Sequence, residues 1–146
     1  MSQYLLLKQG TIHNAVDEEA FVADILIEDG KIKKIAPVLE GKVINEAAVI
    51  DAMGIDVYPG FVDAHCHLGL DGYAVGFAGQ DFNELGDPVT PQLSAIDAIN
   101  PQDETFRMAR EGGVTCVSTG PGSSNVIGGT FCNCLLYTSD AADDKA

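Results

Sequence analysis

The sequence predicts an α/β protein with a β-rich N-terminal part and a strand–helix–strand unit in its second half. Short apolar stretches separated by turn residues fill positions 3–57, a pattern typical of a small β-sandwich or β-roll. From position 58 onward, an apolar strand, a long loop, a helix pattern and a second apolar strand follow one another. A strand, a crossover helix and a strand in this order imply a parallel sheet.

The N-terminal part is expected to contain short strands and tight turns. The strands are expected over residues 4–8, 11–13, 23–28, 31–36, 48–51 and 55–58. Gln9-Gly10 is expected to be a turn, and Asp29-Gly30 is a strong two-residue hairpin signal. Residues 37–47 are expected to form a loop. His13 lies in this region and is expected to be a surface histidine rather than a metal ligand.

The second half contains one clear helix pattern. Asn100 is expected to be its N-cap and Pro101 its first residue, followed by the acidic pair Asp103-Glu104. Gly112-Gly113 is expected to end the helix. The helix residues expected to face inward are Phe106, Met108 and Ala109, and the next strand is expected over residues 114–119.

The strand before the long loop carries the most informative side chains. The apolar stretch 59–64 ends in His65 and His67, which are two positions apart. Because side chains alternate along a strand, both imidazoles are expected on one face and Cys66 on the other. Two imidazoles side by side at the C-terminal end of a strand can bind one metal ion.

Two glycine-containing loops follow the predicted strands of the second half. The loop 68–102 includes Asp81, Glu84 and Asp87, and connections this long are usually functional or disordered. Two readings stay open for it, a wall of a substrate pocket or an irregular insertion that packs against another subunit. Gly120-Pro121-Gly122 fits neither a dinucleotide fingerprint nor a P-loop, so a tight turn near the active face is expected.

Composition excludes several classes of function. The formal net charge of -14 and the pI near 4.2 leave no basic surface for nucleic acid or an anionic membrane. No stretch approaches the roughly 20 apolar residues of a membrane span, and no signal peptide pattern is apparent. The four cysteines lack a disulfide-scaffold spacing, so a cytoplasmic location is expected. Cys132-x-Cys134 matches no common zinc signature and is not expected to bind metal.

Three motifs occur in a specific order. They are Ala23-Asp24-Ile25-Leu26-Ile27-Glu28-Asp29-Gly30-Lys31-Ile32, then Val49-Ile50-Asp51-Ala52, then Pro59-Gly60-Phe61-Val62-Asp63-Ala64-His65-Cys66-His67. From about residue 5 to about residue 130, the chain resembles the amidohydrolase superfamily, with imidazolonepropionase-like proteins as the nearest likeness. The resemblance implies a TIM-like (β/α)8 metallo-hydrolase barrel that interrupts a small composite β-sandwich.

The resemblance also implies a division of the chain and a set of site residues. Residues 1–57 would form the N-terminal part of the sandwich, and residues 58–133 the start of the barrel. His65 and His67, at the end of barrel strand one, would bind a divalent metal, zinc in first place with iron or manganese as alternatives. Asp63 would support these ligands from behind rather than bind metal itself. The catalytic acid or base and the remaining ligands have no place in this sequence, since no histidine follows His67.

The function implied by the resemblance is the hydrolysis of an amide. A metal-activated water would attack a non-peptide, possibly cyclic, amide C–N bond of a small molecule. Two alternatives stay open, a metal-dependent dipeptidase of the same superfamily and a non-catalytic binding or assembly module. A homo-oligomeric assembly is also left open.

The last residues have an unusual origin in this interpretation. The stretch from Cys134 to Asp144 can be back-translated into the transposase end and adapter of sequencing libraries. Residues 134–146 are therefore predicted to be a non-native tail, and the chain to be an N-terminal fragment that is inactive and poorly stable by itself.

Overall fold

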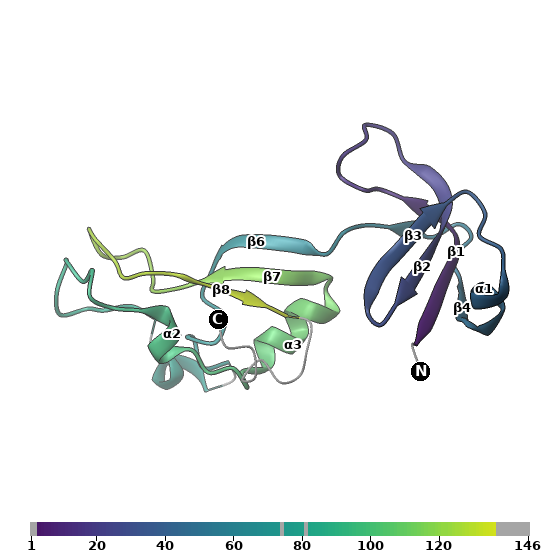
Figure 1. Ribbon diagram of the computed structural model, residues 1–146. Coiled ribbons are helices and arrows are strands. Elements are labelled where there is room, and N and C mark those ends of the chain that lie inside the picture. Colours follow the sequence, from purple (N-terminus) through teal and green to yellow (C-terminus); the bar gives the residue numbers. More distant parts are fainter. Residues whose placement is uncertain (1–2, 74, 81, 137–146) are drawn as a thin grey trace. The chain divides into compact units, whose positions relative to one another are not determined.

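The chain divides into two compact units, a first unit Met1–Pro59 and a second unit Gly60–Ala146. The computed structural model (Figure 1) describes residues 3–73, 75–80 and 82–136. Asp81, which the sequence singles out in the long loop, and residues 137–146 of the predicted tail lie outside the described residues. The predicted limits at 57 and 133 stay predictions.

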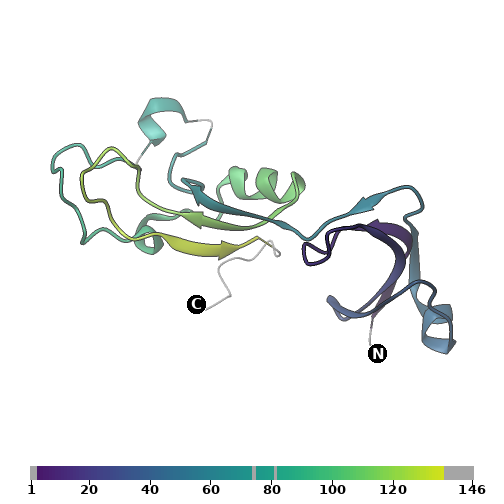
Figure 2. The ribbon, with the colours of Figure 1, turned by 90° about the horizontal axis from the view of Figure 1, so that it is seen from above.

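The first unit is built on one mixed sheet of five strands, ordered β3-β2-β1-β4 with β5 also beside β1. Its strands are β1 (Tyr4–Ile12), β2 (Phe21–Glu28), β3 (Lys31–Ala36), β4 (Ala48–Asp51) and β5 (Asp56–Val57). The pairs β1–β2 and β2–β3 are antiparallel, whereas β4 and β5 run parallel to β1. Figure 2 shows the ribbon from above. The α/β class is confirmed, and the composite sandwich stays a prediction.

The predicted turn at Gln9-Gly10 is wrong, because β1 runs through it as a single strand with a bulge. The pairing of β1 with β2 shifts between Leu7 and Gly10, and Gln9 adopts a φ of 57°. The bulge turns the Gln9 N–H and side-chain amide toward Asp24, whose Oδ1 accepts from both at 2.9 and 3.1 Å. A buried acid therefore holds the chain in the bend that the sequence suggested was a turn.

The hairpin at Asp29-Gly30 is confirmed. Both residues have positive φ, 49° and 77°, which is the geometry that joins two strands in two residues. The region predicted as a loop before β4 instead contains a short helix, α1 (Lys42–Glu46). It was missed because no side chain caps its start and no acidic residue lies in its first turn.

The core of the first unit covers both faces of β2. Ala23 to Leu26 are four consecutive buried residues, which a strand exposed on one face would not show. One cluster contains Leu6, Leu26 and Leu39, and a second contains Ile12, Ala23 and Ile25.

The second unit contains a three-stranded sheet with helices beside it. The strands are β6 (Phe61–Cys66), β7 (Val114–Thr119) and β8 (Cys132–Leu135), and the helices are η1 (Gly76–Gly79), α2 (Ala95–Ala98) and α3 (Glu104–Glu111). β6 and β7 are parallel, with α3 between them in sequence, so the predicted strand–helix–strand unit is confirmed (Figure 1). β8 was not predicted and pairs with β7 in the antiparallel sense. The closed barrel stays a prediction.

Helix α3 begins three residues later than predicted. Its N-cap is Asp103, whose carboxylate accepts from the Thr105 N–H at 2.9 Å. Asn100 instead accepts from Gln102 N in the turn before the helix. Gly112 ends the helix as predicted. Met108 does not face inward, since its side chain is 45% exposed.

Candidate metal centre

The two candidate ligands lie together at the C-terminal end of β6. The strand ends at Cys66, so His65 is its last but one residue and His67 the first residue after it. Their ring centroids are 5.3 Å apart, and the ring planes are nearly perpendicular at 85°. His65 is exposed and His67 is half-buried. The strand thus brings both imidazoles to one place, as the spacing predicts.

The tautomer of His67 is set by a backbone carbonyl. Its Nδ1 lies 2.6 Å from the carbonyl oxygen of Gly120. A carbonyl can only accept, so Nδ1 carries the proton and the lone pair of the neutral ring is on Nε2. A metal-binding histidine commonly has this arrangement, in which one nitrogen is anchored and the other is available.

The ends of β6 and β7 are held together by two further hydrogen bonds. The Gly120 N–H donates to the Cys66 carbonyl at 3.2 Å, and the Thr119 hydroxyl donates to the Leu68 carbonyl at 2.7 Å. Thr119 is fully buried. The carbonyl that anchors His67 is therefore fixed relative to the strand from which His67 comes.

His65 is contacted by residues of the loop after β7. Its Nε2 lies 3.4 Å from the Ser123 hydroxyl, and its ring centroid lies 4.9 Å from that of Phe131. Asp63 accepts from the backbone N–H of His65 at 3.1 Å. This contact goes to the main chain of His65, and the predicted supporting role of Asp63 stays a prediction.

The separation of the two rings can be compared with that expected around a zinc ion. With Zn–N bonds of about 2.0–2.1 Å and tetrahedral angles, two imidazole centroids would lie roughly 5 Å apart. The observed separation of 5.3 Å agrees. Within the described part of the chain, however, no group of three or more histidine, cysteine, aspartate or glutamate side chains could hold a metal ion. A catalytic zinc site usually has three protein ligands, so the role of His65 and His67 as metal ligands stays a prediction.

The long loop after His67 lies along the loop after β7. Its backbone is joined to that loop by hydrogen bonds at Thr90, Ala95 and Thr130, among others, and two parallel bridges form at Val89–Ile127 and Ser94–Thr130. Of the two readings left open by the sequence, packing against another subunit is not needed to account for its path. The pairing brings residues 82–95 beside the loop after β7, which contacts both histidines.

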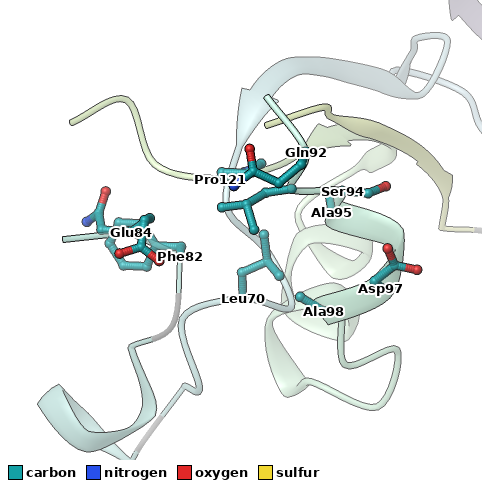
Figure 3. A pocket seen from close by; sticks show the side chains of 11 residues that line it. Leu70, Phe82, Glu84, Gln92, Ser94, Ala95, Asp97, Ala98 and Pro121 are labelled. Carbon is teal, nitrogen blue, oxygen red and sulfur yellow. The ribbon is translucent and has the colours of Figure 1, made fainter. Parts of the chain in front are cut away.

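A pocket of about 280 Å³ opens within this loop pair (Figure 3). It is lined by Leu70, Phe82, Asn83, Glu84, Gln92, Leu93, Ser94, Ala95, Asp97, Ala98 and Pro121. Phe82 also stacks on His67, with ring centroids 5.1 Å apart and planes 17° from parallel. Phe82 therefore both lines the pocket and contacts the ring of His67.

Comparison with known proteins gives relatives of one kind, although no family model matches the chain. The amidohydrolase tasK of Hapsidospora irregularis is 36% identical over 110 residues, which are 75% of this chain and 11% of that protein. The crystal structure of an amidohydrolase from Thermotoga maritima MSB8 superposes with a TM-score of 0.81 and 37% identity, covering 94% of this chain and 35% of that one. The chain belongs to the amidohydrolase superfamily.

Other members of the superfamily match a shorter part. A D-hydantoinase of Geobacillus stearothermophilus is 46% identical over 67 residues, which are 44% of this chain and 13% of that enzyme. The chain therefore spans between about a tenth and a third of the length of these relatives. The finer likeness to imidazolonepropionase stays a prediction.

His65 and His67 of this chain contact residues that no sequence pattern indicates. Phe82, Phe131 and the Gly120 carbonyl all contact the imidazoles. The Gly120-Pro121-Gly122 sequence directly after a strand predicts a turn near the active face. It does not predict that the Gly120 carbonyl contacts His67. An aromatic residue in a long loop carries no spacing that would reveal its contact.

Two cysteine side chains of β8 lie beside each other. The Sγ atoms of Cys132 and Cys134 are 3.8 Å apart. Burial, followed by the neighbouring Cys132, raises the pKa of the Cys134 thiol to about 12. The expectation that Cys132-x-Cys134 does not bind metal stays a prediction.

None of the helices in the described part of the chain could span a membrane.

Proposed function

We propose that this chain carries part of the active site of a metal-dependent amidohydrolase that cleaves a non-peptide, cyclic amide C–N bond. The observation that carries the proposal is the anchoring of His67 Nδ1 by the Gly120 carbonyl at 2.6 Å, beside a second imidazole at 5.3 Å. This arrangement leaves the lone pair of His67 on Nε2, next to a second imidazole that is exposed.

The residues of this chain would bind and orient the metal. When bound, a divalent ion, zinc in first place with iron or manganese as alternatives, supplies a Lewis acid and a water of lowered pKa. His65 and His67 would each donate one ring nitrogen. The Gly120 carbonyl keeps the proton of His67 on Nδ1, and the Asp63 carboxylate holds the backbone of His65.

The pocket beside Phe82 is proposed as a substrate subsite. Glu84 and Asp97 line it, and among the described lining residues there is no lysine, arginine or histidine (Figure 3). Amide and hydroxyl groups of Asn83, Gln92 and Ser94 are also present. Such a lining accepts hydrogen bonds from N–H groups of a neutral or cationic amide and disfavours an anionic one.

Metal content and activity of the full-length natural protein test the proposal. His65→Ala and His67→Ala are compared with His13→Ala, the matched control, because His13 lies in the first unit and pairs with Asp56 at 2.9 Å. We expect His65→Ala and His67→Ala to lose metal and hydrolysis of cyclic amides, and His13→Ala to keep both. The measurements are elemental analysis and a panel of cyclic amides with dipeptides.

Each other outcome has a definite meaning. Equal metal in all three variants would show that the histidine pair is not a ligand set and would support the non-catalytic module. Turnover of dipeptides but not of cyclic amides would assign the chain to the dipeptidase alternative.

A further inference from the structure

His67 is restrained on two sides by groups that come from different loops. Its Nδ1 faces the Gly120 carbonyl, and one ring face lies against Phe82, with centroids 5.1 Å apart and planes 17° from parallel. We propose that Phe82 is a positioning residue for His67, and that Gly122 holds Phe82 in place. The inference rests on the proposed function, in which His67 binds metal.

One hydrogen bond leaves an imidazole a range of orientations. The bond from Nδ1 to Gly120 sets the tautomer and limits rotation about the Cβ–Cγ bond, but a hydrogen bond tolerates a spread of angles, so some rotation of the ring remains. A flat aromatic ring stacked nearly parallel on the imidazole restricts this rotation and thus the direction of the Nε2 lone pair. Ligand orientation of this kind is what residues around a metal site supply.

Phe82 is itself held by the turn that follows β7. The Gly122 N–H donates to the Phe82 carbonyl at 2.5 Å. The next residue of the loop, Asn83, accepts from the Ser124 hydroxyl at 3.0 Å. The Asn125 amide then donates to the carbonyls of Glu84 and Asp87 at 3.1 and 2.7 Å. The segment bearing Phe82 is therefore joined to residues 122–125 by four hydrogen bonds.

Position 122 has no room for a side chain. A Cβ there would overlap the Asn83 side-chain amide and lie 2.9 Å from Phe82 Cδ2. A methyl group at Gly122 would therefore displace the Asn83 side chain and shift the ring of Phe82. Gly128 offers a matched control in the same loop, because a Cβ there would meet only the Gly122 carbonyl oxygen, at an ordinary 3.9 Å. One turn, residues 120–122, thus controls both restraints on His67.

The affinity of the full-length natural protein for Zn²⁺ tests the inference, measured by competition with a chromophoric chelator. We expect Phe82→Ala and Gly122→Ala to weaken zinc binding by about 10- to 100-fold, as loss of groups that orient a ligand does. Phe82→Tyr, which keeps a flat ring, should bind near the wild-type level. Phe77→Ala is the control for loss of a loop phenylalanine, since Phe77 is 87% exposed, and Gly128→Ala is the control for Gly122→Ala.

A second measurement separates positioning from general stability. Long-range ¹H–¹⁵N spectra report which nitrogen of His67 carries the proton and whether the ring samples one orientation. We expect the Nδ1–H form in the wild-type protein and averaged ring signals in Phe82→Ala. The melting temperature of Phe82→Ala should equal that of the wild-type protein.

Each failure points to one cause. If Phe82→Ala binds zinc like the wild type while His67→Ala does not, the positioning role is wrong and the proposed function stands. If His67→Ala also binds like the wild type, the proposed function fails. If Phe82→Ala does not fold, the zinc affinity of Phe82→Leu replaces it as the test, because leucine keeps the apolar bulk of phenylalanine without a flat face. Weaker zinc binding by Phe82→Leu than by Phe82→Tyr supports the inference, and equal binding overturns it.

Discussion

Asp24 shows how one side chain can bend a strand. It is completely buried, and its carboxylate accepts from Gln9 N, from the Gln9 amide and from Leu39 N. Burial alone would raise the pKa of Asp24, but the hydrogen bonds from Leu39 and Gln9 outweigh it, so the pKa is lowered. The motif around Asp24 is one of those that resemble the superfamily. The role of Asp24 in the bulge has no signal in the local sequence, because Gln9 is fifteen positions away.

Asp24→Asn is expected to destabilise the first unit. The new amide NH₂ would face an N–H donor, which costs about 1–3 kcal/mol for one unsatisfied buried donor. Urea unfolding at neutral pH measures this cost. Asp17→Asn is the matched control, because Asp17 is exposed and surface substitutions usually change stability by less than about 0.5 kcal/mol.

The same carboxylate predicts a pH dependence. Since the pKa of Asp24 is lower in the folded than in the unfolded chain, its stabilisation is fully present above the unfolded pKa near 4. It is lost as the pH falls through the lowered folded value. The stability difference between wild type and Asp24→Asn should therefore be constant from pH 7 to 5 and shrink below about pH 4. A difference that grows on acidification would contradict this role.

The histidine pair shows what spacing can and cannot predict. Two histidines two positions apart at the end of a strand were enough to place both rings together, and the structure has them 5.3 Å apart. The Gly120 carbonyl and the Phe82 ring lie 53 and 15 positions along the chain from His67. Contacts between loops depend on how the loops pair, which local sequence patterns do not contain.

Helix α3 illustrates the same limit for an element. The predicted start at Asn100-Pro101 followed the usual capping preferences, and Asp103 satisfied them as well. In the structure the N-cap is Asp103, which is 8% exposed and accepts from the Thr105 N–H. Competing caps of similar local quality are decided by which of them the surrounding packing buries.

The choice of cap can be measured. Asp103→Ala is expected to cost about 1 kcal/mol of stability through loss of the cap. Asn100→Ala is the matched control and should cost less, because the Asn100 side chain accepts from Gln102 N in an exposed turn. Thermal unfolding of both variants compares them directly, and an equal or larger effect of Asn100→Ala would favour the start predicted from sequence.

For the whole molecule, the sequence predicted the order of elements better than their limits. The succession of strands along the first unit and the parallel β6–β7 pair follow apolar periodicity and turn residues, which are local. The bulge in β1, helix α1 and strand β8 were missed, because each depends on partners from elsewhere in the chain. The barrel, the sandwich and the catalytic group stay predictions.

The isolated residues 1–133 are expected to be poorly stable. In β6, Phe61 and Val62 are 59% and 69% exposed, although strand residues of this kind are usually covered. We expect broad, weakly cooperative thermal unfolding and binding of a hydrophobic dye, measured by calorimetry and fluorescence. A soluble monomer of residues 1–133 that melts cooperatively would contradict this expectation.

The four hydrogen bonds between residues 82–87 and 122–125 also have a consequence for protein engineering. Because Asn125 donates to two carbonyls of the opposite loop, neither loop has an independent shape. Because the acceptors are main-chain carbonyls at positions 82, 84 and 87, a loop 82–95 transplanted from a relative would keep these hydrogen bonds only if its backbone followed the same path. Changes of substrate preference by loop exchange would therefore require both loops to be moved as one cassette.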